Sequence, residues 1–140
     1  MPYPPLVKYL SEQEHRQHFE DVYCNQPLLT FDGIPVRFRK SDFDHAFFES
    51  KNAKDDTFSM LRAERMDWIK ASLEDPNSDR FVGWNNRLKR YDNRRRVTVV
   101  LRNYVVIIGF TNKGAGFFIT AFIADSDRTL KLIRKGPRWA

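Results

Sequence analysis

The stretch from residue 97 to residue 123 constrains the fold most strongly. It contains three runs rich in branched and aromatic residues, at 97–101, 104–110 and 116–123, with short turn-forming connections between them. Consecutive strands joined by short connections pair as an antiparallel meander. Residues 128–133 alternate between polar and apolar side chains, and we expect them to form a fourth strand.

A long helix is predicted over residues 56–76, before the strands. Asp56 or Thr57 can cap its start, and the residue before Pro76 is disfavoured in a helix, which ends it there. Arg62 and Arg65 fall inside the apolar arc of this helix. Burying a charge is costly without a partner, so either both side chains snorkel or pair with carboxylates, or the helix lines a groove that binds an anion.

A shorter helix is predicted from Ser11 to about residue 23, after an extended arm at residues 1–10. Ser11 and Glu14 form a capping box at its start. Its His15 and His18 have the spacing of half a metal site, but no cluster completes that site, and we interpret both as solvated.

Two further local signals follow. Asp32-Gly33 between two apolar runs predicts a hairpin with a type I′ turn over residues 28–38, and Pro35 places part of it at a sheet edge. Ser41 and Asp44 predict a second capping box, opening a helix to about residue 50. In that helix His45 points away from the inner face.

Together these elements predict an α+β fold, with two to three N-terminal helices packed on one face of a four-stranded antiparallel sheet. Residues 1–27 would form an arm and helix, and residues 28–140 a single α+β domain. Cys24 is the only cysteine, which is compatible with a reducing compartment. No apolar run is long enough to span a membrane, so we expect a cytoplasmic protein.

The net charge of +6 indicates a polyanionic partner, with nucleic acid first. Residues 85–96 contain six lysines or arginines and Tyr91. Basic side chains interleaved with an aromatic one are typical of a surface for phosphates and bases. The alternative for this segment is a solvated loop, and for the net charge, solubility.

The strand at 116–123 has two different faces. Phe117, Ile119, Ala121 and Ile123 share the face expected to pack on the helices. On the other face, Phe118 and Phe122 flank Thr120, either as a stacking platform for bases or as part of a strand buried on both sides.

Four segments resemble the barnase–EndoU–colicin–RelE superfamily of small ribonuclease domains, of the phage and mobile-element type. They are FDHAFFES around His45, LRAERMDWIKASLEDP, RRVTVVLRNYVVIIGF, and FFITAF around Thr120. The resemblance covers about residues 28–135. It implies metal-independent cleavage of RNA by attack of the 2′-hydroxyl group, without a cofactor, by a toxin or mobile-element effector.

The resemblance assigns roles to particular residues. His45 would act as acid or base, Arg65 would stabilise the phosphate charge, and Thr120 would hold a phosphate oxygen. The expected substrate-binding residues are Arg62, Arg96, Phe118, Phe122 and Lys131. A toxin of this kind would have a small acidic antitoxin or immunity protein as its partner.

Two alternatives remain at this point. The first is a module that binds nucleic acid without cleaving it. The second is an assembly protein of a phage or mobile element, whose charge serves binding to a protein partner.

Overall fold

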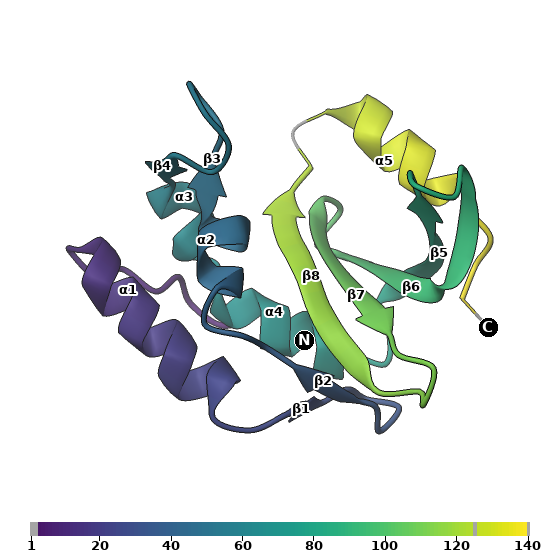
Figure 1. Cartoon of the computed structure of the whole chain (residues 1–140), viewed down its shortest axis with the longest axis horizontal. Coiled ribbons are helices and arrows are strands. Elements are labelled where there is room, and N and C mark those ends of the chain that lie inside the picture. Colours follow the sequence, from purple (N-terminus) through teal and green to yellow (C-terminus); the bar gives the residue numbers. More distant parts are fainter. Residues whose placement is uncertain (1–2, 125, 140) are drawn as a thin grey trace.

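A computed structural model describes residues 3–124 and 126–139. Its centre is a strongly curved sheet of six strands in the order β1-β2-β8-β7-β6-β5 (Figure 1). The strands are β1 (Leu28–Leu29), β2 (Pro35–Arg37), β5 (Asp79–Asn85), β6 (Arg90–Val100), β7 (Tyr104–Phe110) and β8 (Gly116–Ile123). A second, two-stranded sheet pairs β3 (Phe48–Glu49) with β4 (Thr57–Phe58).

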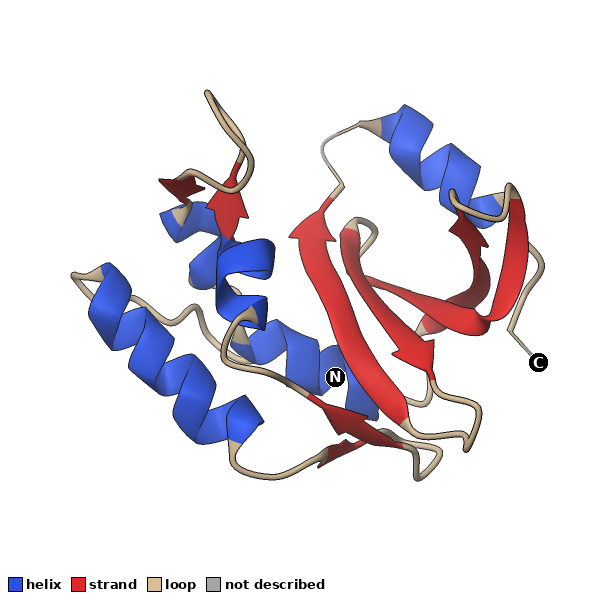
Figure 2. Ribbon diagram, viewed as in Figure 1, coloured by secondary structure: helices blue, strands red, loops and turns tan. Residues whose placement is uncertain are grey.

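The helices lie on both sides of the large sheet (Figure 2). Those beside β2 and β8 are α1 (Glu12–Phe19), which continues as the π-helix η1 (Glu20–Cys24), α2 (Asp42–Phe47), α3 (Met60–Ala63) and α4 (Asp67–Glu74). Helix α5 (Asp127–Arg134) lies apart from them, above β5 and β6.

The α+β class is therefore right, but the predicted four-stranded antiparallel sheet with helices on one face only is wrong. Strands β6, β7 and β8 form the expected meander, and β5 extends it. On the other side, β2 pairs in parallel with β8, which makes the sheet mixed. The hairpin of β1 and β2 thus joins the large sheet, with β1 at its edge.

Alternation along β7 produces two cores, one on each face of the sheet. Tyr104, Val106 and Ile108 point into the first, among aromatic side chains from the N-terminal helices such as Phe19. Val105 and Ile107 point into the second, which Leu130 and Ile133 of α5 help to cover; the other core residues of this face are Phe81, Val97, Val99, Phe122 and Ala124. The segment expected to be a fourth strand is thus an amphipathic helix whose apolar side closes the second core.

The long helix predicted over residues 56–76 is divided. Ser59, not Asp56 or Thr57, caps the start of α3 by accepting a hydrogen bond from the backbone N–H of Arg62. Around Glu64–Met66 the backbone bonds span three residues instead of four, and this tighter turn separates α3 from α4. The predicted end before Pro76 is confirmed.

A β-bulge changes which residues of β8 share a face. Ile107 pairs with Thr120 and Ile108 pairs with Phe118, so Ile119 is an extra residue on β8. Phe118 therefore lies in the first core with Ala121, and its ring stacks on Phe38 at a centroid distance of 4.8 Å. The expected division of this strand into two faces is wrong because strict alternation fails at a bulge.

Of the helix caps predicted at Ser11 and Ser41, the structure confirms only the first. Ser11 caps α1 by accepting from the N–H of Glu14, as predicted, whereas Ser41 makes no side-chain capping bond. The hairpin turn has positive φ at Gly33 alone, so it is not the two-residue type I′ turn.

The solvated position predicted for the two histidines is wrong, because both hold the N-terminal arm. His15 is fully buried, and its ring nitrogens lie 2.9 and 3.1 Å from the carbonyl oxygens of Ser11 and Val7. His18 Nε2 lies 2.7 Å from Oδ1 of Asp67, and its Nδ1 lies 3.0 Å from the Tyr9 hydroxyl. The extended arm is confirmed over residues 3–10; residues 1 and 2 lie outside the described part.

Candidate nucleic-acid interface

The charge of the chain is unevenly distributed along the sequence. Residues 85–140 contain thirteen lysines or arginines against three aspartates. Residues 1–84 contain eleven lysines or arginines against fifteen acidic residues. The excess positive charge is therefore carried by residues 85–96, by α5, by the connections that flank β7 and by the C-terminal segment, because β7 and β8 contain no charged residue.

The basic segment at residues 85–96, for which a solvated loop was the alternative, is mostly part of a β-hairpin. Strand β5 runs to Asn85, β6 starts at Arg90, and Lys89 takes a positive φ of 54° in the turn between them. A register shift at Val82 and Gly83 bends the hairpin. Extended strands hold their side chains at regular spacing, so the hairpin presents its cations as a fixed array.

Eight basic side chains on the hairpin and on α5 make no ion pair with any described residue. Seven are exposed and Arg95 is half-buried; the set is Arg87, Lys89, Arg90, Arg94, Arg95, Arg128, Lys131 and Lys135. Asp92, the one carboxylate of residues 85–96, accepts hydrogen bonds from the N–H of Arg94 and the amide of Asn85, and these bonds lower its pKa. The eight cations are therefore available to an external anion.

Two aromatic side chains stand among these cations. Trp84 and Tyr91 face each other across the hairpin, with ring centroids 5.2 Å apart and planes at 84°. Both rings are exposed, and Trp84 donates its indole N–H to the Asn86 side chain. We call the eight cations together with Trp84 and Tyr91 the basic surface.

A cavity of about 470 Å³ opens on the basic surface, between the hairpin and α5. Its lining is mainly apolar and consists of Val82, Gly83, Trp84, Asn86, Tyr91, Val97, Leu132 and Ile133. Gly136 lets the end of α5 pack closely here, since a Cβ atom at this position would lie 3.0 Å from the Tyr91 ring and from the Val82 carbonyl oxygen.

A second hollow, of about 300 Å³, adjoins the basic surface at Arg94 and Arg95. It is lined in part by Phe117, whose ring is 41% exposed. This ring lies over Gly109, where a Cβ atom would come within 2.4 Å of it. The glycine therefore makes room for an exposed aromatic ring beside two arginines.

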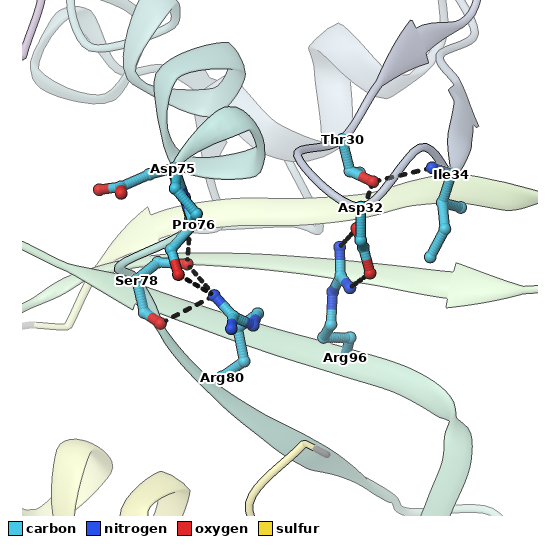
Figure 3. A network of polar contacts seen from close by, with 8 residues as sticks. All are labelled: Thr30, Asp32, Ile34, Asp75, Pro76, Ser78, Arg80 and Arg96. Carbon is cyan, nitrogen blue, oxygen red and sulfur yellow. Dashed lines mark hydrogen bonds and ion pairs between the residues drawn. The ribbon is translucent and has the colours of Figure 1, made fainter.

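Arg96 differs from its neighbours because its side chain is buried. Its guanidinium pairs with the carboxylate of Asp32 at 2.8 Å, as Figure 3 shows, and Thr30 also donates to that carboxylate. Burial would raise the pKa of Asp32, but the hydrogen bonds from Arg96 and Thr30 and the charge of Arg96 outweigh it and lower the pKa. Arg96 thus fastens the β1–β2 turn to the sheet, and its charge is not free for a substrate as the sequence suggested.

Three aromatic rings surround the same guanidinium. The Arg96 Cζ lies 5.7, 5.8 and 5.6 Å from the ring centroids of Phe31, Phe110 and Trp139. The Trp139 ring stacks on Phe110, and the backbone N–H of Trp139 donates to the Arg80 carbonyl oxygen. The C-terminal tail therefore lies along β5.

Among the predicted catalytic residues, His45 is accessible. Its side chain is 49% exposed, and Nδ1 lies 3.7 Å from a carboxylate oxygen of Asp55. Asp55 lies in the β3–β4 loop, which the Asp56 carboxylate organises by accepting backbone N–H bonds from residues 51–53. These bonds, with that from Lys51 the strongest, lower the pKa of Asp56 to about 2.

The two arginines near α3 both have protein partners. Arg62 donates to the Phe48 carbonyl oxygen at 2.9 Å. Arg65 donates to the Leu61 carbonyl oxygen at 2.8 Å and to the Glu64 carboxylate at 2.9 Å. Arg65 thus pairs with a carboxylate, one of the alternatives that the sequence left open, whereas Arg62 bonds to a backbone carbonyl oxygen instead.

The remaining predicted residues are dispersed. Thr120 is half-exposed opposite Ile107, and Lys131 is exposed on α5. Phe118 and Phe122 pack into the first and the second core, so they do not form an open stacking platform. Within the described part of the chain, no hydrogen bond or ion pair joins His45, Arg65 and Thr120.

Trp84 was missed in the sequence. It lies seven positions before Tyr91, and the polar segment between them, Asn85–Arg90, contains neither Gly nor Pro to mark a turn. The available signal was the pair of aromatics flanking Asn85–Arg90, because aromatic side chains often pair across a hairpin.

In residues 3–124 and 126–139, no three His, Cys, Asp or Glu side chains gather closely enough to hold a metal ion together. No helix in the same ranges is long and apolar enough to cross a bilayer. Comparison with protein-family models, curated proteins and solved structures found no match to this chain.

Proposed function

We propose that this chain is an RNA-binding domain and that the basic surface is its RNA-binding site. The observation that carries the proposal is the set of eight cations that form no ion pair with a described residue, arranged around Trp84 and Tyr91. Cations neutralise phosphates without regard to sequence, and exposed aromatic rings stack on unpaired bases. Bases are unpaired in the loops and single-stranded regions of RNA, which is why RNA is favoured over duplex DNA.

The first prediction concerns the cations of the hairpin. A variant with Arg87, Arg90 and Arg94 all changed to Gln should bind RNA more weakly and with less dependence on salt. The slope of log affinity against log salt should fall by about 2, since each phosphate contact on a single strand contributes about 0.7. Fluorescence anisotropy with labelled RNA over a series of salt concentrations measures this slope.

The matched control changes Lys8, Arg37 and Lys51 to Gln. These side chains are also exposed and form no ion pair with described residues. Their substitution removes the same total charge as the hairpin variant. The control should keep the wild-type salt slope. An equal loss in both variants would mean that only the net charge matters, and the basic surface would then not be the site.

A second candidate function is metal-independent cleavage of the bound RNA. The observation that favours it is the exposed imidazole of His45 beside the Asp55 carboxylate. A carboxylate can orient an imidazole, and imidazole can take the proton of a 2′-hydroxyl group or return one to the departing 5′-oxygen. The resemblance to the ribonuclease superfamily points to the same residue.

Under this second function, wild-type protein incubated with RNA in EDTA should produce fragments ending in 2′,3′-cyclic phosphate. His45→Gln should slow cleavage by about a hundredfold or more, which is the usual contribution of a general acid or base. Its RNA affinity should be unchanged because His45 lies outside the basic surface. Intact RNA after incubation with the wild type would remove the catalytic role and leave the binding function in place.

A further inference from the structure

We infer that the cavity between the β5–β6 hairpin and α5 takes one unpaired nucleobase of the bound RNA. The inference rests on the proposed function and adds a ligand class for one part of the site. The sequence did not indicate this cavity. A base bound in the cavity would make the basic surface selective for single-stranded over double-stranded RNA.

The size and lining of the cavity suit a nucleobase. Its volume of about 470 Å³ lies within the range of small-molecule pockets. Trp84 and Tyr91 line one side of it, on the hairpin, and Leu132 and Ile133 line another, on α5. A base placed between these groups would exchange water for aromatic and aliphatic contacts on its two faces.

A polar group for the edge of a base is also present. The side-chain oxygen of Asn86 accepts the indole N–H of Trp84 at 3.0 Å, which leaves the amide N–H groups of Asn86 as donors at the cavity. An amide donor suits the carbonyl oxygens that uracil, cytosine and guanine carry on their edges. A base can therefore be held by contacts on its faces and by a hydrogen bond at its edge.

The charges around the cavity identify the occupant as part of a polyanion. Arg87, Lys89 and Arg90 follow Trp84 along the hairpin, and Lys131 and Lys135 lie on the α5 side. None of these five forms an ion pair with a described residue. An apolar ligand without charge would leave this rim unused, whereas a nucleotide chain can seat a base in the cavity and its phosphates on the rim.

Duplex RNA cannot occupy the cavity in this way, because its bases are stacked and paired inside the helix. It can still contact the rim through its phosphates. The cavity should therefore add affinity for a single strand only, and the rim should add affinity for both forms.

The test compares two probes, fluorescein-labelled oligouridine and the same oligouridine annealed to oligoadenosine. Trp84→Ala and Leu132→Ala in the full chain should each weaken binding of the single strand, by roughly tenfold for Trp84→Ala, the usual effect of losing one stacking contact. Binding of the duplex should stay at the wild-type level. Leu61→Ala is the matched control, since Leu61 is 57% exposed on α3 and Leu132 is 56% exposed on α5.

Each outcome has one reading. Loss of single-strand affinity alone in both cavity variants supports the nucleobase site. Unchanged single-strand affinity, or an equal loss for single strand and duplex, overturns it while leaving RNA binding intact. If wild-type protein binds neither probe, the proposed function itself fails. Circular dichroism of the variants verifies that they are folded, as expected for side chains that are about half exposed.

Discussion

Asp32→Ala should lower the free energy of unfolding by about 3 kcal/mol, because removing the partner of a buried charge leaves that charge uncompensated. The Arg96 guanidinium is fully buried, and its Nε atom has no hydrogen-bond partner in the described part of the chain, so Asp32 is its main compensation. Urea denaturation followed by circular dichroism measures the change.

Asp79→Ala provides the control for this substitution. Asp79 also pairs with arginines, Arg134 and Arg138, but all three side chains are exposed, and such pairs contribute less than about 1 kcal/mol. Equal destabilisation by the two substitutions would show that the Arg96–Asp32 pair contributes no more to the free energy of unfolding than an exposed ion pair does.

Asp32→Ala should also change how the stability of the protein depends on acid pH. The pKa of Asp32 is lowered in the folded protein, so its contribution to stability is complete above the unfolded pKa of about 3.9. That contribution is lost as the pH falls through the folded pKa. The stability difference between wild type and Asp32→Ala should therefore be constant near neutral pH and shrink below about pH 4.

Phe118→Ala should lower the free energy of unfolding by about 4 kcal/mol, the usual cost of removing a buried phenyl ring. Phe118 is 2% exposed and stacks on Phe38 in the first core. Phe118→Ala protein that remains folded should bind RNA with wild-type affinity, because the Phe118 ring does not reach the surface. Denaturation and anisotropy measurements on the same preparation separate the two properties.

The neighbouring residue gives the opposite expectation. Phe117 is 41% exposed, so Phe117→Ala should cost much less stability than Phe118→Ala. Its ring lines the hollow beside Arg94 and Arg95, so the same change should weaken RNA binding. If Phe118→Ala weakens binding in the folded protein and Phe117→Ala does not, the assignment of faces on β8 is wrong.

The reversal between Phe117 and Phe118 shows what alternation in a sequence can and cannot predict. The strand itself was predicted correctly, because a run of branched and aromatic residues between turn signals is a strong local pattern. The bulge at Ile119 was not, because an extra residue in one strand is defined only by its pairing with the neighbour. Every face assignment on one side of the bulge was therefore inverted.

The last helix was mistaken for a strand because short segments fit both periods. Leu130 and Leu132 alternate as in a strand, but Leu130 and Ile133 also have helical spacing. Ser126, which caps α5 by accepting from the N–H of Thr129, was the local signal for a helix. The second core stabilises the helix by burying its apolar side. Strands distant in the sequence contribute to this core, so the local pattern does not reveal it.

The sequence was enough to predict where positive charge is concentrated in the candidate site, but not how the charged side chains are arranged in space. The basic segment at residues 85–96 stands out in the sequence, and five of its six cations lie on the hairpin without an ion pair to the part of the chain that the structure describes. The sixth, Arg96, is buried because its partner Asp32, 64 positions earlier, reaches it only through the packing of the β1–β2 turn on the sheet. No local pattern distinguishes these two outcomes for adjacent arginines.

The most direct test of the account is to map the RNA on the protein by amide chemical shifts while single-stranded RNA is added. The account predicts that the shifting amides cluster at residues 82–97 and 128–135, the hairpin and α5. Shifts confined to α1–α4 with the hairpin unchanged would contradict it by placing the site elsewhere. The absence of any shift at excess RNA would contradict RNA binding itself.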